Sequence, residues 1–127
     1  MKKLVLAIAV ATVTGCSAKS LEMEQSSADK YSTLTDEQFM AEAEEGVKYS
    51  VIDPTSVLMR NQRIVRTPED HRVLCVDVNG KNKFGGYTGF QAMNWYAGTL
   101  YPNNNVGLGL GETMRNDARV KLCRSAQ

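Results

Sequence analysis

The N-terminal segment constrains this chain most, because it decides the compartment in which the remaining residues fold. Lys2 and Lys3 precede a largely apolar run from Leu4 to Val13. This run is much shorter than the roughly 20 apolar residues of a membrane-spanning helix, and it lacks the polar face of a helix packed on a domain. A basic start, a short apolar centre and small residues at the end are typical of an export signal.

The tetrapeptide VTGC closes this run, ends at Cys16 and resembles the bacterial lipobox. In proteins with that motif the cysteine is lipidated and becomes the mature N-terminus, which implies a signal peptide over residues 1–15. Val13 stands where leucine is usual. Two or more acyl chains anchor a protein stably, and Ser17 in place of an aspartate implies the periplasmic face of the outer membrane. The alternative is an ordinary cleaved signal beside an incidental Cys16.

The charge balance argues against a nucleic-acid partner. The chain has 15 Lys and Arg against 14 acidic residues, and loss of Lys2 and Lys3 with the signal leaves it nearly neutral. Domains that bind nucleic acid present a basic patch or stripe. We interpret Arg60, Arg63 and Arg66 as the solvated face of a strand and expect no nucleic acid among the partners.

Cys75 and Cys123 remain once Cys16 is assigned to the lipid. An even pair of thiols in an oxidising compartment predicts a disulfide. The bridge closes a loop of about 49 residues, for which the chain-entropy model gives about 4 kcal/mol of stabilisation. A redox pair or a zinc site fits less well, because there is no CxxC and His71 is the only histidine. We expect no metal and no other cofactor.

The mature chain divides into a tether and one domain. Residues 16–34 are polar, serine-rich and without a sustained apolar period, so we expect a lipidated N-terminus followed by a flexible tether. Residues 35–127 have the length of a single small domain. Thr35 and Gln38 form a capping-box pattern, which predicts a helix over residues 36–49. Its apolar face consists of Phe39, Met40, Ala43 and Val47.

Three later segments have the alternation of β-strands. They cover residues 56–65, 71–78 and 87–96, and the second, HRVLCVDV, alternates in the manner of a half-buried strand. We predict an α+β domain in which an N-terminal helix packs on a small antiparallel sheet and one disulfide joins the parts.

The stretch that carries Cys123 is ambiguous. Ala118, Val120 and Leu122 alternate as in a strand, whereas Met114, Ala118 and Leu122 match the period of a helix. We favour the helix.

Glycine-rich stretches suggest cofactor motifs that the residues do not complete. In KNKFGGYTGF a Gly-Tyr pair follows where a phosphate loop needs Lys-Ser/Thr, and the later GLGLG run has the spacing GxGxG rather than GxGxxG. No GxSxG motif is present. Asp53 with Asp77 as an acid–base pair has no sequence support for proximity. We therefore expect no catalytic residues and no enzyme activity.

Two segments resemble one family. Residues 75–90 read CVDVNGKNKFGGYTGF, and upstream the segment DPTS, residues 53–56, is followed by Arg60-Asn61. Both are similar to a group of small exported proteins of Gram-negative bacteria and their prophages, largely uncharacterised, with a VCGxVNxKNx(F/Y)GGYxG(F/P) motif. The resemblance covers about residues 53–95 and implies a late cysteine such as Cys123, but it implies no activity.

The glycine-rich stretch is also the candidate binding loop. Its asparagines and glycines suit a hairpin turn, whereas its lysines and aromatic rings suit contact with a partner. The candidate residues are Lys81, Asn82, Lys83, Tyr87, Phe90 and Trp95. We expect non-enzymatic binding of an envelope protein or another envelope component, with prophage-type envelope modification as one version. The alternative is a glycan-binding module or an inhibitor of a cell-wall hydrolase; a small hydrolase comes third.

Overall fold

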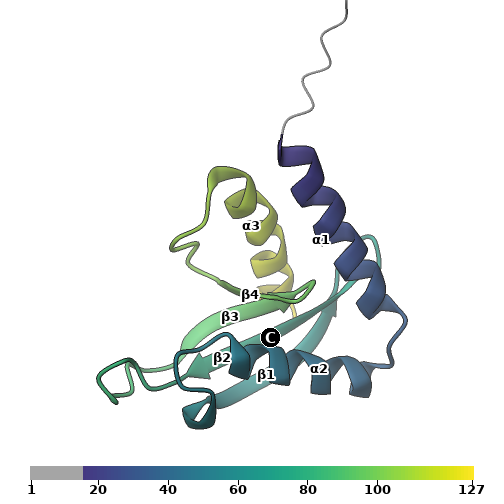
Figure 1. Cartoon of the computed structure of the whole chain (residues 1–127). Coiled ribbons are helices and arrows are strands. Elements are labelled where there is room, and N and C mark those ends of the chain that lie inside the picture. Colours follow the sequence, from purple (N-terminus) through teal and green to yellow (C-terminus); the bar gives the residue numbers. More distant parts are fainter. Residues whose placement is uncertain (1–15) are drawn as a thin grey trace, which may run out of the picture.

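Three α-helices and one four-stranded sheet make up the described part of the chain, residues 16–127 of a computed structural model (Figure 1). In chain order the elements are α1 (Cys16–Ser32), α2 (Asp36–Tyr49), the 3-10 helix η1 (Pro54–Ser56), β1 (Leu58–Arg66), β2 (Arg72–Asn79), β3 (Gln91–Tyr96), β4 (Thr99–Pro102) and α3 (Leu110–Ser125). The expected signal peptide, residues 1–15, lies outside the described residues. None of the described helices is long and apolar enough to cross a membrane.

The strands form an antiparallel meander in the order β1-β2-β3-β4, which confirms the predicted α+β class. Helix α2 covers one face of the sheet, where its buried side chains pack with Leu74 and Trp95. On the other face Val73 and Cys75 pack with α3 and with Ala28 of α1. Strand β2 is therefore buried on both faces rather than half-buried, because helices cover the side that its alternation assigned to water.

The helix predicted over residues 36–49 is α2, and it begins with the predicted capping box. The Gln38 N–H donates to Thr35 Oγ1 (3.2 Å), and the Thr35 N–H donates to Gln38 Oε1 (3.0 Å). Phe39, Ala43 and Val47 are fully buried against the sheet. The predicted apolar face is thus the one that packs.

The predicted flexible tether is wrong for most of its length, because Cys16–Ser32 form α1. Ala28 and Tyr31 pack this helix on the domain, and polar contacts add to the packing. Glu24 pairs with Arg115 of α3 (Oε2 to Nε, 3.3 Å), and Asp29 Oδ1 lies 3.0 Å from His71 Nε2. The sequence of α1 has no apolar period that would predict its docking, because these partners are charged or polar groups far along the chain.

Gly46 of α2 lies against the indole of Trp95. A Cβ at this position would be 2.5 Å from Trp95 Nε1, far inside van der Waals contact. In a helix interior Ala is normally more stable than Gly by roughly 0.5–1 kcal/mol. We expect Gly46→Ala to lower the free energy of unfolding instead, by about 1–3 kcal/mol, because the indole must move. Urea unfolding measures the change, and a variant more stable than the wild type would contradict this packing.

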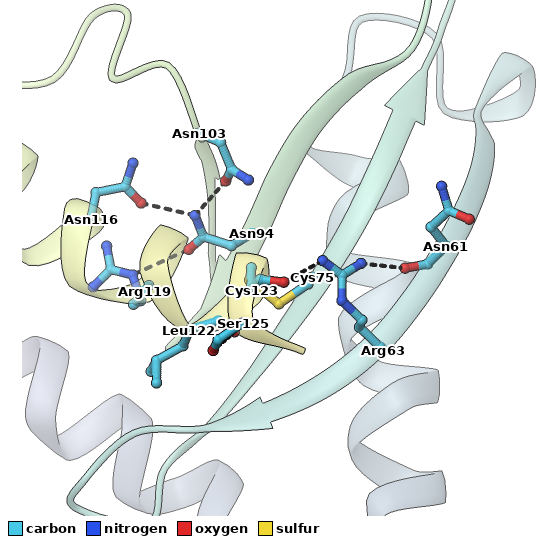
Figure 2. Close-up of a disulfide and its surroundings, with 10 residues drawn as sticks. All are labelled: Asn61, Arg63, Cys75, Asn94, Asn103, Asn116, Arg119, Leu122, Cys123 and Ser125. Carbon is cyan, nitrogen blue, oxygen red and sulfur yellow. Dashed lines mark hydrogen bonds between the residues drawn. A yellow bond between two sulfur atoms is a disulfide. The ribbon is translucent and has the colours of Figure 1, made fainter. Parts of the chain in front are cut away.

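The predicted disulfide is present. It joins Cys123 of α3 to Cys75 of β2, with Cα atoms 5.7 Å apart and a sequence separation of 48 (Figure 2). The segment around Cys123 is helical, as favoured. The residues whose spacing matched a helix are not its buried side, because Met114 is 68% exposed whereas the polar Asn116 and Arg119 are buried. The disulfide is on the same side of α3 as these two polar residues.

Strand β1 has a bulge between Arg60 and Arg63, where Asn61 adopts a positive φ of 56°. The Arg63 guanidinium donates to the carbonyl oxygens of Asn61 (3.0 Å) and Cys123 (2.6 Å), as Figure 2 shows. A cation at the C-terminal end of α3 is favourable for the helix dipole. Arg63 is therefore half-buried and bound, while Arg60 and Arg66 are exposed as predicted.

Candidate binding loop

The connection between β2 and β3 forms a protruding hairpin loop, residues 80–90 (Figure 1). Lys81 and Tyr87 pair as an antiparallel bridge across it. Ser56 of η1 ties the base of the loop to the domain, because Ser56 Oγ accepts from the Lys81 N–H (2.9 Å) and Ser56 O accepts from the Tyr87 hydroxyl (2.9 Å). The hairpin loop is therefore fixed on the body of the protein.

Asn82 organises the tip of the hairpin loop. Its Oδ1 accepts from the Phe84 N–H (2.9 Å) and the Gly86 N–H (3.2 Å), and its own N–H donates to the Gly86 carbonyl (2.9 Å). Gly85 has a φ of 80°, a conformation that favours glycine. The glycines thus shape a hairpin, as predicted, and the side-chain oxygen of Asn82 is engaged within the turn.

The tip presents an aromatic ring beside cations. Phe84 is 85% exposed, the Lys83 ammonium lies 5.2 Å from its ring centroid, and Lys81 is exposed nearby in the chain. Phe90, another predicted residue, is partly covered by the Arg60 guanidinium, 3.9 Å from its ring centroid. Phe84 is missing from the residues predicted from sequence, although its place between lysine and glycine in a turn marks it as a side chain that packing would not cover.

Trp95 does not belong to this surface, and its prediction as a binding residue is wrong. It lies in β3 opposite Leu74 and is 2% exposed. Its ring packs edge-on against Tyr31 (centroids 4.9 Å apart) and Phe39 (5.7 Å). The strand begins at Gln91, and the alternation of β3 turns Trp95 towards α2.

A buried polar layer between β3 and α3 was not predicted (Figure 2). Asn94 Nδ2 donates to Asn116 Oδ1 (2.9 Å) and to Asn103 Oδ1 (2.9 Å), while its Oδ1 accepts from Arg119 Nε (3.1 Å). The sequence holds one clue to it. Asn116 and Arg119 precede Cys123 by seven and four residues, so a bonded cysteine places them on the same side of a helix.

The Arg119 guanidinium is sandwiched between two aromatic rings, 4.7 Å from the centroid of Tyr96 and 4.4 Å from that of Tyr101. Burial lowers the pKa of Arg119 from its usual value, and Glu24, whose Oε1 lies 3.5 Å away, opposes this shift. Burial also raises the pKa of both tyrosines. The cation is therefore held by rings and one carboxylate in the interior.

A cavity of about 460 Å³ lies between α1, α3 and the turn before β2, with His71 and Tyr96 in its wall. His71 is buried, with Nδ1 3.1 Å from the Tyr96 hydroxyl and Nε2 3.0 Å from Asp29 Oδ1. Burial raises the pKa of the Tyr96 hydroxyl, which therefore ionises less readily than that of a free tyrosine. We interpret this chain of groups as a polar clamp between α1 and the sheet.

The carboxylates considered as an acid–base pair have separate local roles. Asp77 Oδ2 accepts from Asn61 Nδ2 (2.7 Å) and Arg60 Nε (3.3 Å) at the β1 bulge, and Asp53 Oδ1 caps η1 through the Thr55 N–H (3.1 Å). Within residues 16–127 no group of three or more His, Cys, Asp or Glu side chains could hold a metal ion.

Comparisons with models of protein families, with curated proteins and with solved structures found no match for this chain.

Proposed function

We propose that this chain is a lipoprotein anchored through Cys16 to the periplasmic face of the outer membrane, where its hairpin loop binds an envelope protein without catalysis. The export signal and the VTGC motif support the anchor. A disulfide-bonded body is consistent with an oxidising compartment. Envelope modification of the prophage type is one version of this role.

The arrangement of the fold suits an anchor at one end and a binding tip at the other. Figure 1 shows the Cys16 end of α1 and the hairpin loop at opposite ends of the molecule. The 17 residues of α1 extend roughly 25 Å at about 1.5 Å per residue. A domain anchored at Cys16 would therefore direct Phe84 away from the bilayer that carries it.

The observation that carries the proposal is an exposed Phe84 on a braced turn. Burial of a phenylalanine side chain contributes about 1.5–3 kcal/mol, and a loop already ordered by Asn82 loses little conformational entropy on binding. Lys81 and Lys83 favour association with an acidic surface. The partner best matched to this tip is a protein with an apolar pocket rimmed by carboxylates.

The glycan alternative has less support from the side chains of the loop. Sugar stacking needs open aromatic faces, but Trp95 is in the core and the Phe90 ring lies under Arg60. Phe84 and the half-exposed Tyr87 are then the rings of the loop that a sugar could meet.

Capture of crosslinked partners from intact envelopes tests the proposal. We expect Phe84→Ser to weaken capture at least about tenfold, the equivalent of 1.4 kcal/mol. We expect the double variant Lys81→Ala/Lys83→Ala to weaken capture too, and more strongly in low salt than in high salt. Tyr49→Ser is the matched control, since this α2 side chain is 77% exposed outside the hairpin loop.

Equal capture by wild type and Phe84→Ser would overturn the assignment of the loop. Retention of the wild type on purified peptidoglycan, lost in Phe84→Ser, would favour the glycan-binding alternative instead.

A further inference from the structure

Helix α3 leaves large apolar side chains in solvent while its polar side chains are buried. Leu110 is 81% exposed, and Met114 follows one turn later in the same state. Val106, in the loop before α3, is also mainly exposed. We call Val106, Leu110 and Met114 the apolar end. Single exposed apolar residues are ordinary, whereas a group of them marks a contact surface.

The apolar end lies on the side of the molecule where α1 begins. Glu24 of α1 pairs with Arg115 (3.3 Å) and Arg119 (3.5 Å) of α3, and Figure 1 shows the N-terminal ends of both helices on the same side. At about 1.5 Å per residue, Cys16 lies roughly 12 Å beyond Glu24 and Leu110 roughly 8 Å beyond Arg115 along their helices. Cys16 and Leu110 therefore lie at nearly the same level along the two helices, on the side where both helices begin.

The loop that presents Val106 is braced on α3. Asn105 Nδ2 donates to Asp117 Oδ1 (2.7 Å), and Asn116 Nδ2 donates to Asn105 Oδ1 (2.8 Å). The chain next to Val106 is therefore held against α3.

We infer that the apolar end is a second membrane contact, which enters the boundary between headgroups and acyl chains beside the lipid on Cys16. This inference rests on the lipidation in the proposed function. Apolar side chains at a bilayer surface gain free energy by leaving water, and one further contact restricts the orientation of a domain that a lipid alone leaves free. The domain then stands with its hairpin loop directed away from the bilayer.

A bilayer fits the apolar end better than a second copy of the chain does. A specific protein interface buries about 800 Å² on each partner, more than the few side chains of the apolar end can supply by themselves. The position beside Cys16, rather than at a distant face, is what a lipid surface requires.

Depth-dependent quenching of the native lipoprotein tests the inference. With Cys16 lipidated and Cys75 bonded to Cys123, a thiol introduced by Leu110→Cys or Phe84→Cys is the only one free to take an environment-sensitive fluorophore. These positions are matched in exposure, 81% and 85%. In vesicles of phosphatidylethanolamine and phosphatidylglycerol with brominated acyl chains, we expect severalfold stronger quenching and a blue shift at position 110.

Every outcome of this experiment decides between the proposals. Equal quenching at positions 110 and 84 in a protein whose intact mass includes the lipid would overturn the membrane contact and leave the lipid anchor standing. A mass without the lipid would overturn both. Energy transfer between labels at position 110 of different molecules would assign the apolar end to a second copy instead.

Discussion

Replacing both Cys75 and Cys123 by alanine is expected to lower the free energy of unfolding by about 4 kcal/mol, the chain-entropy value for a loop of this length. The two sulfurs join residues separated by 48 positions, and both side chains are buried. A small domain has a total stability of about 5–15 kcal/mol, so this one change removes a large share of it. Urea unfolding, followed by circular dichroism, measures the loss.

Reduced wild-type protein is the control for this experiment. Its unfolding midpoint should approach that of the alanine variant, because both lack the same constraint on the unfolded chain. Amide exchange in α3 should accelerate most, since the disulfide fixes this helix to β2 next to the Asn94 layer. A variant as stable as the oxidised wild type would show that packing alone holds α3.

Trp95→Ala is expected to destabilise the domain by about 3–5 kcal/mol, as large-to-small substitutions of buried aromatic residues do. The indole fills the space between α2 and the sheet, where Tyr31 and Phe39 contact its ring. Trp95→Phe should cost much less, about 1.5 kcal/mol or below. One reason is that no acceptor among the described residues bonds the buried Trp95 Nε1, so no hydrogen bond is lost. Chemical denaturation of both variants provides the comparison.

Partner capture separates this structural role from a binding role. The folded Trp95→Phe protein should capture the proposed envelope partner as the wild type does, because the ring lies in the core and outside the hairpin loop. Phe84→Ser should show the reverse behaviour, with stability changed by less than about 0.5 kcal/mol and capture lost. If Trp95→Phe abolished capture while the unfolding midpoint of the variant stayed normal, Trp95 would have a role in binding after all.

The candidate site was predictable only in outline. Asn82 and Gly85 have side-chain and backbone properties that suit a turn in any context, and the structure contains that turn. The exposure of a side chain depends instead on what packs nearby. Phe84 is in solvent, Phe90 is partly covered by Arg60, and Trp95 lies in the core.

The sequence by itself determined the elements that local chemistry specifies. The capping box at Thr35 starts α2, the spacing of its apolar residues selects the face that packs, and Cys75 and Cys123 pair with each other. These outcomes depend on residues close together in the chain, or on the even pair of thiols that remains when Cys16 is assigned to the lipid.

Only the tertiary structure decided how the remaining surfaces are used. Helix α1 docks on the domain because Arg115 and His71, distant in sequence, meet its carboxylates, and because its Tyr31 packs on Trp95. Helix α3 buries Asn116 because Asn94 lies opposite to satisfy its amide, so the rule that apolar residues face inward does not select its buried side. Burial of a polar group depends on the partner that the fold supplies, and periodicity within one segment carries no record of that partner.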